Sequence, residues 1–94
     1  MKVYSVSESV KAISDYLELG LGPIAIQGEI VDFKISQGKM VFFELKDNSS
    51  RMLMFGLKWQ LEGIEDLEDG MEVKVLGVPK LFKKSGKFHI AVKE

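Results

Sequence analysis

The fold is decided by residues 24–35, which read IAIQGEIVDFKI. Apolar side chains recur at every second position, at Ile24, Ile26 and Ile30, and this period of 2 indicates a β-strand. The run is about 12 residues long, more than most single strands. Gly28 inside it predicts a bend or bulge at which the strand changes partners. The chain is therefore expected to contain one long, bent strand.

Four shorter strands are predicted after this run, at residues 39–47, 51–55, 71–79 and 88–92. In the first of them, alternation places Val41, Phe43 and Leu45 on the core face and leaves Phe42 outside. In the next, both faces are apolar, so no inward set can be assigned. In the last strand, alternation places Phe88 inside, with Ile90 and Val92.

Helical patterns occur at two places. Ser5 and Glu8 have the spacing of a capping box, and apolar residues follow at 3.6-like intervals, so a helix is predicted at about residues 7–19. Gly20 and Pro23 are expected to end it. A short helical segment is predicted at about residues 57–64, between the third and fourth strands.

The order of elements is one helix, three strands, a short helical segment and two strands. Closing five short strands into a barrel removes the exposed edges of a flat sheet, and a helical insert can plug one end. This plan is the OB-fold, a five-stranded Greek-key barrel. We expect a mainly β protein, a single OB-fold domain over residues 1–94 with its barrel at about 23–93. An SH3-like barrel is the alternative, but it does not place a helical segment at about 57–64.

Composition excludes several classes of protein. The chain has no cysteine, which removes disulfide scaffolds and thiolate metal sites. No run approaches the ~18–20 apolar residues of a membrane span, and the N-terminus lacks the apolar core of a secretory signal. We therefore expect a cytoplasmic chain with no membrane partner. The sequence ends at Lys93-Glu94, directly after the last predicted strand, and this favours a piece of a longer protein.

The net charge of −1 hides an uneven distribution. Residues 60–72 carry six acids and no base, whereas residues 73–94 carry six lysines and one glutamate, a net charge of +5. A face that binds polyanions must therefore be local and involve the C-terminal third. The alternative is that both charged blocks are solvated loops.

The sequence offers no constellation of catalytic residues. His89 is the only histidine and is predicted to be an exposed polar residue. With one histidine and no cysteine, zinc catalysis is not expected. Glu29 and Asp32 are more simply solvated charges than a carboxylate pair. The acids of residues 60–72 lack the spacing of a calcium loop. No catalytic residue, metal site or cofactor is predicted in this chain.

Cations interleaved with aromatic residues are instead typical of proteins that bind single-stranded nucleic acid, where lysines meet phosphates and rings stack on bases. In an OB barrel the second and third strands and the loops after the first and fourth strands form the binding face. The candidate contact residues are Phe33, Lys34, Lys39, Phe42, Lys46, Arg51, Lys80, Phe82, Lys83, Lys84 and Lys87. The alternative function is a protein-interaction or oligomerisation module, including a homodimer, which would use exposed Met52, Met54, Leu57 and Trp59.

The ordered motifs of the chain resemble the N-terminal domain of the exodeoxyribonuclease VII large subunit. The motifs are Gly28-Glu29-Ile30, Phe42-Phe43-Glu44-Leu45-Lys46-Asp47, Met54-Phe55 and Gly86-Lys87-Phe88-His89-Ile90. The resemblance covers about residues 4–93. It implies an OB-fold that holds single-stranded DNA for a separate exonuclease region. It also implies, as partners, the rest of the large subunit and a small subunit. Any divalent metal of the nuclease reaction would belong to that separate region.

Overall fold

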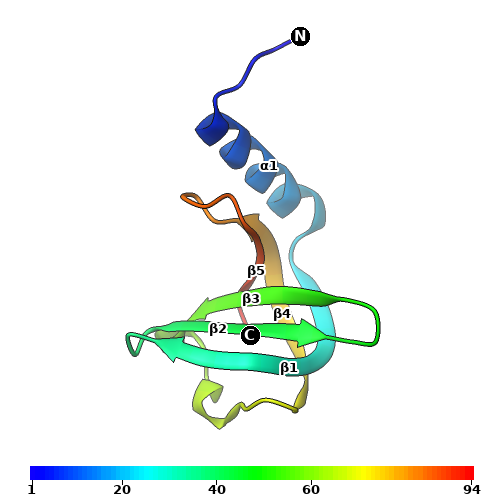
Figure 1. The fold of residues 1–94 in the computed structure, drawn as a ribbon, viewed down its shortest axis with the longest axis vertical. Helices are drawn as coiled ribbons and strands as arrows, with labels where there is room; N and C mark the ends of the chain where they lie inside the picture. The colour runs from blue at the N-terminus through cyan, green and yellow to red at the C-terminus, as the bar shows by residue number, and fades with distance from the viewer.

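A computed structural model describes residues 1–94, and five strands form a closed barrel in the order β1-β2-β3-β5-β4 (Figure 1). All neighbours are antiparallel except β3 and β5. The predicted five-stranded OB-fold is confirmed. The elements are α1 (Val6–Leu21), β1 (Ile24–Ser36), β2 (Met40–Lys46), β3 (Arg51–Leu57), η1 (Lys58–Gln60), η2 (Ile64–Asp66), β4 (Glu72–Leu81) and β5 (Phe88–Val92).

Strand β1 is long because it serves two neighbours. Residues 24–29 pair with β4 and residues 29–36 pair with β2, so the strand changes partners directly after Gly28, as predicted. A Cβ on Gly28 would lie 2.9 Å from the Lys46 carbonyl oxygen, which explains the glycine at this crossing. The bulge itself lies further along, at Asp32, whose φ of 56° interrupts the register with β2.

The core lies inside the barrel. Val41, Phe43 and Leu45 of β2 are buried, as alternation predicted. On β3 the structure settles what the sequence left open, because Met54 is fully buried and Phe55 faces outward. The complete buried cluster is Ile30, Val41, Phe43, Leu45, Met54, Leu61, Ile64, Val75, Ile90 and Val92.

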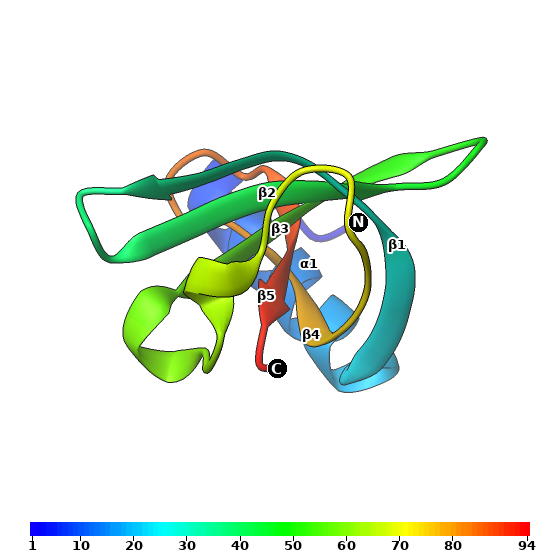
Figure 2. The same ribbon diagram turned by 90° about the horizontal axis from the view of Figure 1, so that it is seen from below.

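The segment between β3 and β4 crosses the end of the barrel that faces the viewer in Figure 2, which is the lower end in Figure 1. The short helix expected here is present as two 3₁₀ turns, η1 and η2, instead of one continuous helix. Gly63 lies between them with a φ of 71°. This left-handed conformation interrupts a right-handed helix, and glycine adopts it readily. Leu61 and Ile64 are buried, so the segment still closes one end of the barrel.

Helix α1 lies at the opposite end and projects away from the barrel (Figure 1). Both hydrogen bonds of the predicted capping box, between Ser5 and Glu8, are present. The helix is two residues longer than expected at its C-terminus, because Gly20 stays helical and the chain leaves the helix only at Gly22. It is anchored on β4, where the Leu81 N–H donates to the Ser14 hydroxyl over 3.0 Å. No helix in the structure has the length and apolarity needed to cross a bilayer.

Two expectations for β5 are wrong. Phe88, expected in the core, is 42% exposed because it pairs only with Leu81 of β4 and has no partner on β3. His89, expected to be exposed, is only 4% exposed, since the ring of Phe82 covers it. Alternation gives the face of a side chain but does not show what covers that face.

Candidate nucleic-acid interface

The outer face of the barrel carries a row of aromatic rings, which we call the aromatic stripe: Phe42, Phe55, Phe82 and His89. Phe42 and Phe55 are cross-strand partners on β2 and β3, with ring centroids 5.1 Å apart. Phe55 meets Phe82 edge to face at 5.2 Å and His89 at 5.8 Å. The three phenylalanines are half-buried, so each residue keeps some surface open to solvent.

One end of the aromatic stripe is a stacked pair. The rings of Phe82 and His89 lie 3.7 Å apart and within 15° of parallel. Burial lowers the pKa of His89, which keeps the imidazole uncharged at neutral pH. A hollow of about 310 Å³ adjoins the pair and is lined in part by Phe55, Lys80 and Lys83. This end of the stripe therefore combines flat apolar surface with positive charge.

The other end of the stripe is covered by a cation. The Lys34 ammonium lies 5.9 Å from the centre of the Phe42 ring, within the range of a cation–π contact. Lys34 reaches this position because of the bulge at Asp32. The extra residue shifts the alternation of β1, so that Phe33 turns toward the core and Lys34 turns outward, opposite Phe42.

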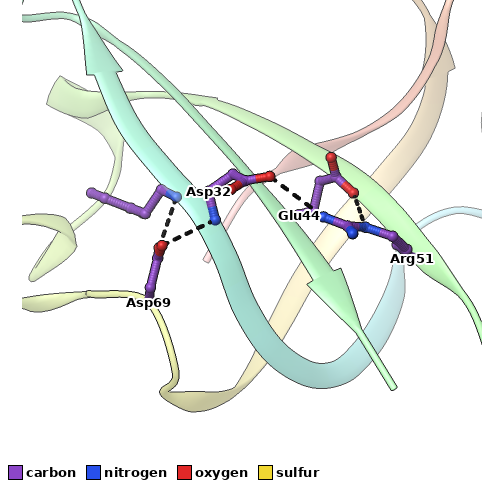
Figure 3. A network of polar contacts seen from close by, with 5 residues as sticks. Asp32, Glu44, Arg51 and Asp69 are labelled. Carbon is purple, nitrogen blue, oxygen red and sulfur yellow. Dashed lines mark hydrogen bonds and ion pairs between the residues drawn. The ribbon is translucent and has the colours of Figure 1, made fainter. Parts of the chain in front are cut away.

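Asp69, from the loop before β4, holds the bulge in place (Figure 3). Its carboxylate accepts hydrogen bonds from the backbone N–H groups of Asp32, at 3.2 Å, and Phe33, at 2.8 Å. The bulge interrupts the β1–β2 register here, and a carboxylate is a strong acceptor for the two N–H groups. Asp69 therefore fixes which side of β1 carries Lys34.

We expect Asp69→Ala to lower the free energy of unfolding by about 0.5–2 kcal/mol, the usual cost of losing a side-chain acceptor for backbone N–H groups. Urea denaturation measures this change. Asp66→Ala is the matched control, because Asp66 is also an exposed acid of the same segment and its carboxylate forms no ion pair. The control should stay within about 0.5 kcal/mol of the parent chain. Equal losses in both variants would contradict the assignment.

Arg51, a predicted contact residue, is engaged by carboxylates. Its Nε donates to Glu44 over 2.6 Å, and a terminal nitrogen lies 3.4 Å from Asp32 (Figure 3). Lys46 pairs with Arg51 across the β2–β3 hairpin and lines a hollow with Glu29 and other polar residues. This end of the hairpin gathers acids around its cations, and neither cation lies at the aromatic stripe.

The lysines of the β4–β5 turn are differently placed. Lys83, Lys84 and Lys87 are exposed and form no ion pair. Lys83 and Lys84 directly follow Phe82, and Lys87 ends the same turn. Lys80, by contrast, is half-buried and lies 3.7 Å from Glu18 of α1. Lys39 lies in the β1–β2 turn.

Phe33, a predicted contact residue, does not belong to the aromatic stripe. It is half-buried on the inner side of β1, with its ring 5.8 Å from that of Phe43. We assign it to the core. Phe55 was absent from the predicted contacts because both faces of its strand are apolar. Only the strand register, which pairs Phe55 with Phe42, shows that Phe55 belongs to the outer face.

The structure contains no group of three or more His, Asp or Glu side chains placed to hold a metal ion. The acids of the segment before β4 are spread along it, and Asp69 among them is used for the bulge.

A closed five-stranded barrel with rings and cations on its outer face defines a nucleic-acid-binding OB domain. A family model described as an OB-fold nucleic acid binding domain matches residues 4–94, and the chain belongs to this family. Within it, the chain is similar to exodeoxyribonuclease 7 large subunits. It is 35% identical over 92 residues to that of Rickettsia canadensis (strain McKiel), covering 97% of this chain and 21% of the relative. It is 33% identical over 94 residues to that of Clostridium botulinum (strain Eklund 17B / Type B), covering 96% and 23%.

These matches confirm the resemblance drawn from the sequence motifs. The chain spans about a fifth of the length of these relatives. Among solved structures, a chain from a replication protein A heterotrimer bound to ssDNA superposes with a TM-score of 0.64. The match covers 79% of this chain and 55% of that chain at 16% identity, which shows a shared fold.

Proposed function

We propose that this domain binds single-stranded DNA across the aromatic stripe and holds it as substrate for an exodeoxyribonuclease VII-like large subunit. The observation that carries the proposal is the row formed by Phe42, Phe55 and Phe82, with Lys34 over one end and the β4–β5 lysines beside the other. Bases stack on the rings, and phosphates meet the ammonium groups. The names of the relatives and of the ssDNA-bound structural neighbour support the choice of ligand.

In this proposal the domain supplies binding and no catalytic residue. Cleavage, and any divalent metal that it uses, belong to a separate region of the large subunit. The proposed partners are the rest of that subunit and a small subunit, and the proposed location is the cytoplasm. Of the residues predicted from sequence, the proposed contacts are Lys34, Phe42, Phe82, Lys83, Lys84 and Lys87, joined by Phe55. Because the net charge is −1 and few phosphates are met, the isolated domain should bind weakly and lose affinity as salt rises.

Fluorescence anisotropy with labelled oligo-dT at low salt tests the proposal. We expect the double variant Lys83→Ala/Lys84→Ala to weaken binding and to lower the slope of log affinity against log salt by about 1.4, at ~0.7 per phosphate contact. The matched control is Lys46→Ala/Lys74→Ala, which removes the same charge from the part of the barrel near Glu29 and Glu72. The control should bind nearly as the parent does.

Absence of binding by the parent chain at high protein concentration would overturn the proposal, as would equal effects of the two double variants. The alternative, an oligomerisation module, has less support than the sequence indicated, because Met54 is fully buried and Met52 packs against the core. Sedimentation velocity separates the two functions. A tight dimer that excludes oligo-dT would favour the interaction module, whereas a monomer that binds DNA favours the proposal.

A further inference from the structure

Trp59, the only tryptophan of the chain, lies outside the aromatic stripe and is 75% exposed. We propose that Trp59, Lys39 and Lys58 form a further nucleotide subsite, in which a base of the single strand stacks on the indole and its phosphate meets the two lysines. The inference rests on the proposed function and extends it to a part of the surface that the β2–β3 face does not include.

The backbone beneath the ring is fixed by hydrogen bonds. The Lys58 N–H donates to the Lys39 carbonyl over 2.8 Å, which ties η1 to the β1–β2 turn. The Leu61 N–H donates to the Lys58 carbonyl over 3.2 Å, and the Leu61 side chain is buried in the core. The indole is therefore presented from a braced turn, and stacking a base on it requires little ordering of the backbone.

The chemistry around the ring suits a nucleotide better than an apolar partner. A hollow of about 310 Å³ is lined by Gly38, Lys39, Lys58, Trp59 and Glu65. Four of these five residues are charged or lack a side chain, so the hollow beside the indole is mostly polar. The phosphate is expected beside Lys39 and Lys58, because their ammonium groups attract it, and the Glu65 carboxylate repels phosphate from its own side of the hollow.

The subsite continues the path of the aromatic stripe. Met40 and Leu57 are the next outward-facing cross-strand pair after Phe42 and Phe55, and Trp59 follows two residues beyond Leu57. At a rise of ~3.3 Å per strand residue, Leu57 is about 7 Å from Phe55 along the strand. Trp59 is the next exposed ring along the chain after Phe55, so a single strand that follows β3 past its end leads toward it.

The unique tryptophan gives the test its signal. Oligo-dT of increasing length, from about 4 to about 16 nucleotides, is added to the parent chain while anisotropy reports binding and Trp59 fluorescence reports stacking. We expect long oligonucleotides to quench the fluorescence. We also expect Trp59→Ala to weaken their binding at least about fivefold, the effect of one lost stack. Trp59→Phe should keep most of the affinity, and Glu65→Gln should raise it.

The matched control is Tyr16→Ala, which removes an aromatic ring that is 80% exposed on α1, away from the hollow. It should leave the affinity unchanged. Long oligo-dT that binds by anisotropy without quenching Trp59, with Trp59→Ala binding as the parent does, would overturn the subsite and leave the proposed function standing. Absence of any anisotropy change with the parent chain would overturn both.

Discussion

Phe43→Ala is expected to lower the free energy of unfolding by about 3–5 kcal/mol, the cost of removing a large ring from a close-packed core. Phe43 is 2% exposed, lies in the centre of β2 and packs against Phe33. A small domain has a total stability of about 5–15 kcal/mol, so the variant should be only marginally folded. Chemical denaturation followed by circular dichroism measures the loss.

The neighbouring residue provides the control. Phe42 has the same side chain on the same strand, but it faces outward and is half-buried. Phe42→Ala should therefore cost clearly less stability than Phe43→Ala and should weaken the binding of oligo-dT instead. If both variants lost the same stability, the inward and outward faces of β2 would be wrongly assigned.

Phe55→Ala is expected to produce the largest loss of DNA affinity of any single variant of the stripe. Phe55 touches Phe42, Phe82 and His89, so its removal takes away one stacking surface and leaves the neighbouring rings without support. The expected loss is about 1–3 kcal/mol, or about 5- to 150-fold in affinity. Anisotropy with oligo-dT at fixed salt measures it.

Two controls separate stacking from packing. Phe55→Leu keeps an apolar side chain but removes the flat ring, so it should retain most of the stability and still lose affinity. Leu53→Ala changes the preceding outward position of β3, which pairs with Glu44 and lies outside the stripe. It should leave the affinity within about twofold, well below the effect of a lost stack. Full binding by Phe55→Leu would show that the ring contributes packing alone.

The fold was largely accessible from the sequence because its signals are local. Alternation in β2 predicted the inward set of Val41, Phe43 and Leu45, and the capping box predicted where α1 begins. Gly28 marked the place where β1 changes partners. The boundaries of β1, β2 and β5 followed within one residue from the turn residues between apolar runs, whereas β3 and β4 each continue two residues past the predicted end. Each of these features depends on residues within a few positions of one another.

The binding face was accessible only in part. Phe42, Phe82 and the β4–β5 lysines were expected at the interface, but Phe55 was not assigned to a face and His89 was expected to be exposed. Arg51 has the charge of a phosphate contact, yet Glu44 and Asp32 surround it in the barrel. Nothing in the sequence around Asp69 indicates that its carboxylate holds a bulge 36 and 37 residues away.

The order of residues along the chain thus determined that five strands and a leading helix would form, because periodicity and turn chemistry act between near neighbours. Tertiary structure decided which rings meet and which cations remain unpaired. Those outcomes depend on the register between strands and on a single bulge that reverses the faces of β1 after Asp32. A shift of one residue moves every following side chain to the other face, so the site exists only once the barrel has closed.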